Sequence, residues 1–173
     1  MAYDFKYVKV LVVESSVPMF QLVKGVLNLL TVPEKNVYAS YTVEEAFLNF
    51  KQLNHDIILV DWLQNPDRGI LLTKMIRRDK TSINQFVPII MTAGSGHLAR
   101  VVKARDAGVS EYLVKPFSAK SLADRIVRVI EKQREFVVSE EYVGPDRRVK
   151  QLPFEGEDRR KTQAVRSVAG TGR

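Results

Sequence analysis

The sequence predicts an α/β fold: a doubly wound, five-stranded parallel sheet with five helices, followed by an extended C-terminal tail. Two observations predict it. Over residues 7–134, short runs rich in β-branched residues alternate with stretches whose apolar residues recur every three or four positions. In addition, the central run at residues 57–60 lacks polar residues, which is typical of a strand covered on both faces.

The first part of this pattern contains three strands. A strand is expected over residues 8–13, and the helix after it has an apolar face formed by Val17, Phe20, Val23, Leu27 and Leu30. After a short strand at 37–39, Thr42 lies three residues before Glu45, which fits a capping box at the start of the second helix. The apolar run at 57–60 is the third strand.

The second part adds two strands. Residues 89–91 form the fourth strand, and Pro88 lies just before it, where a missing N–H costs least. Gly108 can end the fourth helix in a left-handed conformation. Residues 112–114 form the last strand, and Ser118 can cap the last helix.

The pattern stops near residue 134. Residues 1–134 are therefore taken as one domain, and residues 135–173 as an arginine-rich tail that is disordered unless a ligand binds it. The net charge of the 173 residues is +7. At 39 residues, the tail is expected to be too short for a helix-turn-helix output domain, and it lacks the apolar pattern of one.

Composition excludes several functions. The absence of cysteine excludes disulfides and thiolate sites, and two histidines, His55 and His97, which are expected at the surface, cannot form a multi-histidine metal site. No apolar run approaches the ~20 residues of a membrane span, and the N-terminus lacks the apolar stretch of a secretory signal. A cytoplasmic protein without a membrane partner is expected.

Chemically useful residues follow four of the predicted strands. They are Glu14 with Ser15, Asp61, Thr92 and Lys115. Ligands bind at the carboxyl ends of parallel strands, so these side chains should converge at one edge of the sheet. The set suits phosphoryl transfer to a carboxylate, with Asp61 as nucleophile, Lys115 and Thr92 on phosphoryl oxygens, and a divalent cation between the charges.

The motifs LVVESS, ILVDW followed by Gly69, IIMTA and EYLVKPFS occur in this order, and residues 7–134 resemble the receiver domain of bacterial response regulators, especially the single-domain, CheY-like kind. The resemblance implies a flavodoxin-like receiver fold. It also implies a signalling module of two-component systems, including chemotaxis, and not an enzyme.

The resemblance also implies roles for particular residues. It implies Asp61 as phosphoacceptor, Thr92 and Tyr112 as the switch pair, Lys115 as the family's lysine and a cis peptide before Pro116. Histidine kinases are the family's phospho-donors and magnesium is its usual ion. The implied metal ligands are Glu14, Asp61 and the backbone carbonyl of Leu63.

The acidic cluster departs from the family pattern. Receivers typically have two acids after the first strand, and the second touches the metal, whereas this chain has Glu14 and then the neutral Ser15. Because magnesium prefers carboxylates, we expect weak or absent magnesium binding and slower or absent phosphorylation. Asp67 is a nearby acid that could in principle compensate.

The tail contains a duplicated motif. Four of five positions are identical between residues 144–148 (GPDRR) and 156–160 (GEDRR). An arginine fork fits guanine O6 and N7 and can stack on the base, while an aspartate can accept from the guanine N1 and N2 protons. The tail resembles the arginine-rich segment of Cle-type CheY-like proteins, which bind cyclic di-GMP. The resemblance extends to Asp146, Arg147, Arg148, Asp158, Arg159 and Arg160.

Three functions remain open. The first is a stand-alone CheY-like regulator whose tail binds cyclic di-GMP and whose receiver docks a protein such as a flagellar motor component, with weakened phosphorylation at Asp61. The second is a conventional phosphorelay receiver, phosphorylated on Asp61 by a histidine kinase, with an inert tail. The third, nucleic-acid binding, is least favoured, because acids interrupt the arginines of the tail and no folded nucleic-acid reader is present.

Overall fold

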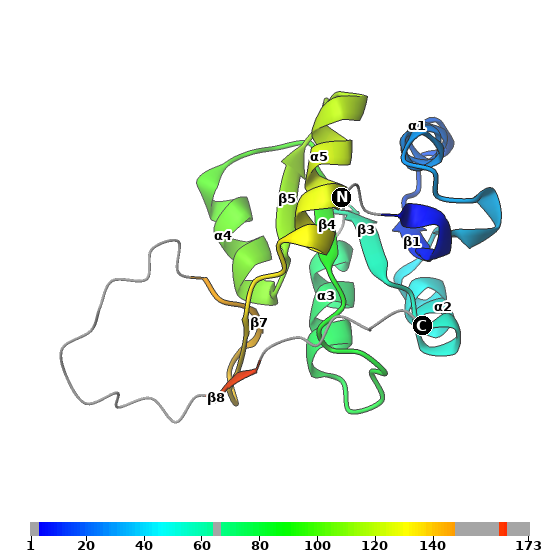
Figure 1. The fold of residues 1–173 in the computed structure, drawn as a ribbon. Helices are drawn as coiled ribbons and strands as arrows, with labels where there is room; N and C mark the ends of the chain where they lie inside the picture. Colours follow the sequence, from blue (N-terminus) through cyan, green and yellow to red (C-terminus); the bar gives the residue numbers. More distant parts are fainter. Residues whose placement is uncertain (1–3, 64–66, 148–162, 166–173) are drawn as a thin grey trace.

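The computed structural model describes residues 4–63, 67–147 and 163–165. Its centre is a parallel sheet with the strand order β2-β1-β3-β4-β5 (Figure 1). The strands are β1 (Val10–Val13), β2 (Val37–Ser40), β3 (Ile57–Asp61), β4 (Ile89–Ala93) and β5 (Glu111–Val114). The helices are α1 (Val17–Leu29), α2 (Val43–Leu53), α3 (Arg68–Arg78), α4 (Leu98–Ala107) and α5 (Ala119–Glu131). The predicted flavodoxin-like receiver fold is confirmed.

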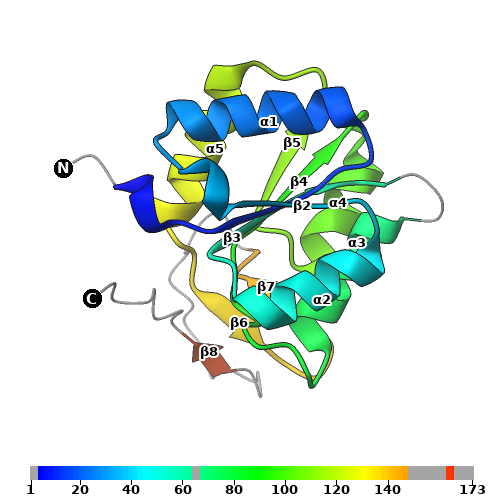
Figure 2. The ribbon, with the colours of Figure 1, turned by 90° about the vertical axis from the view of Figure 1, so that its right-hand side faces the viewer.

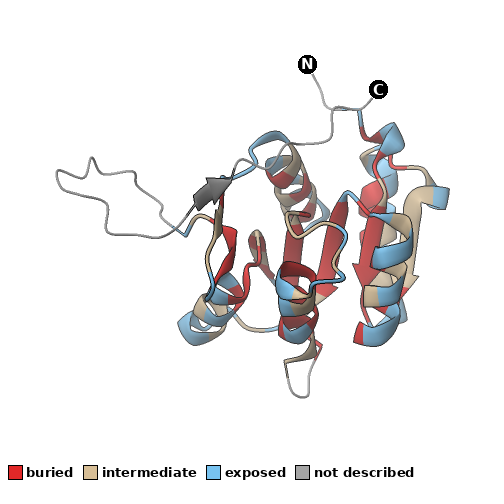
Figure 3. Ribbon diagram, turned by 90° about the horizontal axis from the view of Figure 1, so that it is seen from below, coloured by how far each residue is buried: buried red, intermediate tan, exposed pale blue. Residues whose placement is uncertain are grey.

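Helices cover both faces of this sheet. Helices α1 and α5 lie on one face, and α2, α3 and α4 lie on the other (Figure 2). Side chains alternate between the faces, so Val10 and Val12 pack against α1 and α5, while Leu11 and Val13 join the cluster on the opposite face. Strands β1, β3 and β4 are consequently buried on both sides, as Figure 3 shows, which explains their uninterrupted apolar sequences.

The predicted helix ends are present. At the start of α2 the Thr42 hydroxyl accepts a hydrogen bond from the Glu45 backbone N–H at 3.2 Å, and the Glu45 carboxylate accepts one from the Tyr41 N–H at 2.9 Å. Gly108 ends α4 with a φ of 98°. The peptide between Lys115 and Pro116 is cis, as expected.

One expectation about the histidines is wrong. His97 is exposed, but only 1% of His55 is exposed, because it lies just before β3 with its ring edge-on to the Tyr38 ring, 4.8 Å between centroids. Burial first, and then the charge of Lys9, lower the pKa of His55 to about 4. His55 is therefore a neutral core residue at physiological pH.

The segment after α5 contains strands where the sequence predicted none. Strands β6 (Phe136–Val138) and β7 (Val143–Pro145) pair antiparallel, and β8 (Gln163–Val165) pairs with the other side of β6. The hairpin β6–β7 packs under α3 and α4 because Phe136, Tyr142 and Val143 are buried. The division of the chain at residue 134, and the state of the tail outside the described residues, stay predictions.

A buried arginine holds this hairpin to the domain. Arg77, at the end of α3, donates hydrogen bonds to the backbone carbonyls of Gly108 at 2.9 Å and of Gln85 and Val87 at 2.8 Å. Its guanidinium lies 5.1 Å from the centre of the Phe136 ring. Burial lowers the pKa of Arg77 to about 9, so the side chain remains a cation at neutral pH.

Within the described ranges, no helix combines the length and apolar character needed to cross a membrane.

Candidate functional site

The four predicted strand-end residues lie at one edge of the parallel sheet. Asp61 is the last residue of β3 and is in register with Thr92 of β4. Glu14 directly follows β1, the other neighbour of β3, and Lys115 directly follows β5. The topology thus brings together residues that are up to 101 positions apart in the sequence.

Lys115 joins the two acids of this edge. Its Nζ lies 2.7 Å from Glu14 Oε2 and 2.8 Å from Asp61 Oδ1. Burial by itself would lower the pKa of Lys115, but the hydrogen bonds to Asp61 and Glu14 outweigh burial and raise its pKa. The lysine is therefore a fixed positive charge beside the Asp61 carboxylate.

Each carboxylate oxygen of this pair has a hydrogen-bond donor. Besides the two bonds from Lys115, the Leu63 N–H donates to Asp61 Oδ2 and the Ser16 N–H donates to Glu14 Oε1, both at 2.9 Å. Leu63 has a φ of 49°, a left-handed conformation that is uncommon for a residue with a Cβ. These bonds fix the orientation of both acids.

The predicted magnesium ligands fit the ion in kind. Two carboxylates and the Leu63 carbonyl are hard oxygen donors of the type that magnesium prefers. However, Lys115 offsets one of the two negative charges, and the described residues contain no group of three His, Cys, Asp or Glu side chains that could hold a metal. Ser15 is exposed and adds no charge. The weak magnesium binding expected from this small negative charge stays a prediction.

Asp67 is engaged elsewhere. Its carboxylate accepts a hydrogen bond from the Trp62 indole Nε1 at 2.9 Å and forms an ion pair with Lys103 of α4. The hydrogen bond from Lys103 is the main reason that the pKa of Asp67 is lowered. Asp67 therefore connects the residue after Asp61 to α4, and sequence analysis missed Lys103 because no local pattern signals a contact 36 positions away.

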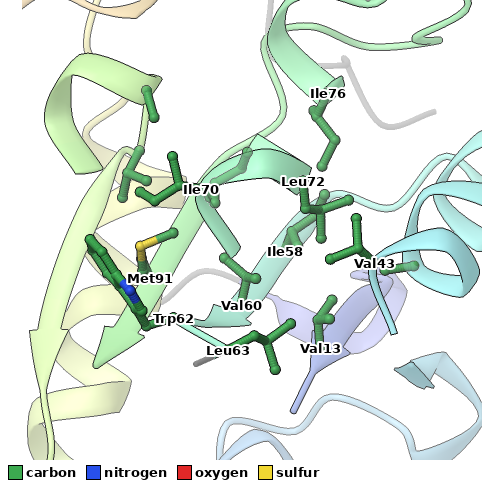
Figure 4. Packing of buried hydrophobic residues seen from close by; sticks show 14 of the residues in the cluster. Val13, Val43, Ile58, Val60, Trp62, Leu63, Ile70, Leu72, Ile76 and Met91 are labelled. Carbon is green, nitrogen blue, oxygen red and sulfur yellow. The ribbon is translucent and has the colours of Figure 1, made fainter. Parts of the chain in front are cut away.

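The predicted switch residues surround a buried tryptophan. Trp62 is 4% exposed and packs in the core beside Met91 (Figure 4). Its backbone N–H donates to the Thr92 carbonyl at 2.7 Å, and its ring is edge-on to Tyr112, with 6.4 Å between centroids. The Tyr112 hydroxyl donates to the Ser95 carbonyl at 2.6 Å. Both Thr92 and Tyr112 therefore contact the residue that follows Asp61.

Gly69 lets α3 approach the acceptor strand. A Cβ at this position would lie 2.3 Å from the backbone oxygen of Asp61 and 3.1 Å from that of Trp62. Any side chain would displace the backbone that carries Asp61. Only glycine therefore fits at this position of the motif.

The tail residues of the predicted cyclic di-GMP site are described only in part. Arg147 lies 4.4 Å from the centre of the Tyr142 ring, and its Nη1 is 2.9 Å from Asp106 Oδ1. The Asp146 N–H donates to the Glu135 carbonyl at 2.7 Å. Four predicted ligands lie outside the described residues: Arg148, Asp158, Arg159 and Arg160.

A wound parallel sheet with an acid pair, a hydroxyl and a lysine at its carboxyl edge defines a receiver-type signalling domain. The chain belongs to the response regulator receiver domain family, whose model matches residues 10–127. This family is a signalling module of two-component systems and not a catalytic enzyme. Its members typically bind Mg²⁺ and pair with histidine kinases.

Individual relatives support this assignment. The chain is 30% identical over 135 residues to the Escherichia coli phosphate regulon transcriptional regulatory protein PhoB, covering 76% of this chain and 56% of PhoB. It thus spans about half the length of that relative. It is 32% identical over 122 residues to a Campylobacter jejuni chemotaxis protein CheY homolog, covering 70% of this chain and 92% of the homolog.

Solved structures support the fold. The Vibrio cholerae chemotaxis response regulator CheY4 aligns with a TM-score of 0.62 at 24% identity and covers 70% of this chain and 98% of CheY4. A response regulator from Thermotoga maritima aligns with the same TM-score at 22% identity, covering 72% of this chain and 98% of the other.

Proposed function

We propose that this chain is a phosphorelay receiver that accepts a phosphoryl group on Asp61 from a histidine kinase. The observation that carries the proposal is the contact of the Lys115 ammonium with both Asp61 and Glu14 at the carboxyl edge of the sheet. In this position Lys115 can pair with the carboxylate before transfer and with a phosphoryl oxygen after transfer, without a rearrangement of the fold.

The described side chains suggest how transfer proceeds. An Asp61 carboxylate oxygen attacks phosphorus, and the bond from phosphorus to the kinase imidazole nitrogen breaks. Thr92, in register with Asp61, supplies a hydroxyl at the next strand end. A divalent cation held by Glu14, Asp61 and the Leu63 carbonyl would screen the charge between the carboxylate and the phosphoryl group. With only two acids, we expect labelling to be slow.

The test is labelling by a small phosphoryl donor, such as acetyl phosphate, at increasing magnesium concentration. We expect slow labelling that is absent in Asp61→Asn and faster in Ser15→Asp, since the added carboxylate strengthens magnesium binding. Gln52→Glu, an exposed position on α2, is the control for a change in total charge. No labelling of either the native chain or Ser15→Asp at saturating donor would contradict the proposal.

A second candidate function is cyclic di-GMP binding by the tail, with the receiver docking a partner such as a flagellar motor component. The duplicated Asp-Arg-Arg motif supports it. The exposed Arg147 also supports it, because its guanidinium is held over the Tyr142 ring and, among the described residues, is paired with Asp106 through Nη1 only, which leaves its other nitrogens for a ligand. Calorimetry with cyclic di-GMP tests it. Binding should disappear in Arg147→Ala/Arg159→Ala, and an absence of heat with the native chain would remove this candidate.

A further inference from the structure

The first arginine motif begins inside the folded domain. Gly144 and Pro145 are buried, and the Tyr142 hydroxyl donates to the Pro145 carbonyl at 2.8 Å. A Cβ on Gly144 would lie 2.7 Å from the Cα of Gly108, so this glycine is pressed against the end of α4. Arg147, two residues after β7, is therefore held at a defined place on the surface.

A pocket lies beside this anchored segment. It is a shallow, open pocket between the end of α5 and strand β6, lined by residues of both elements. Phe86, Phe136 and Pro145 provide an apolar wall, and the side chains of Lys132 and Arg134 contribute to the lining. A pocket this shallow can contact only part of a ligand at its mouth, such as one phosphate or one edge of a base.

The charges of the pocket are unbalanced. Its one acid among the lining residues, Glu111, is paired with Arg125 at 2.5 Å and lies 4.0 Å from Arg128, which also complements the negative end of the α5 dipole. In the described part of the chain, the side-chain nitrogens of Lys132 and Arg134 have neither a hydrogen bond nor an ion pair. Two exposed cations, two positions apart and without a paired acid in that part of the chain, favour an anion.

Strand register brings a third cation to the same place. Phe136 pairs with Pro145, and the bond from the Asp146 N–H to the Glu135 carbonyl continues the ladder by one step. A further step in the same register would place the backbone of Arg134 opposite that of Arg147. The Arg147 guanidinium already has a counter-charge in Asp106, with Nη1 2.9 Å from Oδ1, so Arg147 lies at the margin of the pocket and the two cations that are unpaired among the described residues are Lys132 and Arg134.

We propose that this pocket is a binding site for the phosphate of a nucleotide, held by Lys132 and Arg134 with Arg147 at its margin. The inference rests on the second candidate function only for the identity of the nucleotide, cyclic di-GMP. The partly exposed ring of Phe86 favours a phosphate that carries a planar base over inorganic phosphate. Residues before the tail motif would then bind the nucleotide together with the arginines of that motif.

Calorimetry on the full chain tests the site with three probes: cyclic di-GMP, GTP and inorganic phosphate. The variant is Lys132→Ala/Arg134→Ala. The control, Lys35→Ala/Lys120→Ala, removes the same charge from exposed positions away from the pocket. The variant should bind the nucleotide at least about tenfold more weakly, the control should bind like the native chain, and both should melt like the native chain.

The outcomes separate the two ideas. If the variant and the control lose nucleotide affinity equally, or if neither loses it, the pocket proposal is wrong. Cyclic di-GMP binding by the tail is still supported in that case if Arg147→Ala/Arg159→Ala abolishes binding. Selective loss of GTP binding, with no binding of cyclic di-GMP, supports the pocket and removes the second candidate function. If neither nucleotide binds the native chain, or if inorganic phosphate binds as tightly as the nucleotides, the pocket proposal is wrong.

Discussion

The guanidinium of Arg77 lies 5.1 Å from the centre of the Phe136 ring, and this contact ties the segment after α5 to the receiver domain. Arg77 is fully buried and supports the backbone of three loop residues, while Phe136 is 4% exposed and also packs edge-on against Phe86, 5.2 Å between centroids. The hairpin is therefore part of the folded unit, although the family match ends at residue 127.

Phe136→Ala should consequently lower the free energy of unfolding by about 3 kcal/mol, through lost apolar burial and the loss of the ring under a buried cation. Urea denaturation measures this value. The exposed hairpin position Glu140, substituted by alanine, should change it by less than about 0.5 kcal/mol. An equal effect of the two substitutions would show that the hairpin does not pack on the domain.

The buried His55 predicts that the free energy of unfolding falls between pH 6.5 and pH 4. In the part of the chain that the structure describes, neither ring nitrogen of His55 has a hydrogen-bond partner, and its pKa is lowered to about 4 from an ordinary value of 6.5. Between these two values the unfolded chain binds the proton more readily than the folded chain. The stability contributed by the neutral ring is therefore complete above about pH 6.5 and is lost as the pH falls toward 4, by about 3 kcal/mol in all.

His55→Leu should remove this part of the pH dependence and raise the stability at pH 7 by about 1 kcal/mol, because two buried polar atoms disappear. Denaturation curves at pH 7 and pH 5 measure both effects. His97→Gln, at an exposed position, should leave the profile unchanged. A profile that is the same for the native chain and His55→Leu would argue against a buried neutral histidine.

Sequence patterns predicted the fold because each central strand is a short apolar run that needs no knowledge of its neighbours. The same holds for the acceptor edge, since the strand ends at Glu14, Asp61, Thr92 and Lys115 are local features and parallel topology brings them together. The roles of these residues in phosphorylation stay predictions.

Tertiary contacts explain what the sequence did not reveal. Strands of three residues, as at Phe136–Val138, are too short for a periodic signal, and their stability comes from Phe86 and Arg77 far away in the sequence. Likewise, the burial of His55 depends on Tyr38, and the partner of Asp67 lies on α4. Such contacts depend on the packed structure and leave no local pattern.

Two glycine substitutions, at Gly69 and at Gly25, test whether α3 lies close to the backbone of Asp61. Gly69→Ala places a Cβ 2.3 Å from the Asp61 oxygen, so it should destabilise the domain by about 1–3 kcal/mol and slow the labelling of Asp61. A Cβ on Gly25, within α1, would have no neighbouring atom within 4 Å, so Gly25→Ala should stabilise by about 0.5–1 kcal/mol. Thermal unfolding distinguishes opposite signs directly, and similar shifts for both would contradict the close approach at Gly69.

The contacts of Asp67 with Trp62 and Lys103 predict that the loop after Asp61 stabilises α4. Asp67→Asn keeps an acceptor for the Trp62 N–H but removes the ion pair with Lys103. Amides of α4 should therefore exchange with solvent faster, while global stability should change little. Trp62 is the only tryptophan of the chain, and its emission should shift with the loss of the nearby carboxylate charge.

The pH dependence sharpens this last test. Because the pKa of Asp67 is lowered by Lys103, its carboxylate should keep the contact to α4 until the pH falls below the range in which an ordinary aspartate is protonated. The native chain should then acquire the exchange rates of Asp67→Asn. Glu44→Gln, which breaks the exposed ion pair to Arg68, is the matched control and should leave exchange in α4 unchanged. If both variants alter α4 equally, the effect is one of general surface charge and Asp67 does not connect the loop to the helix.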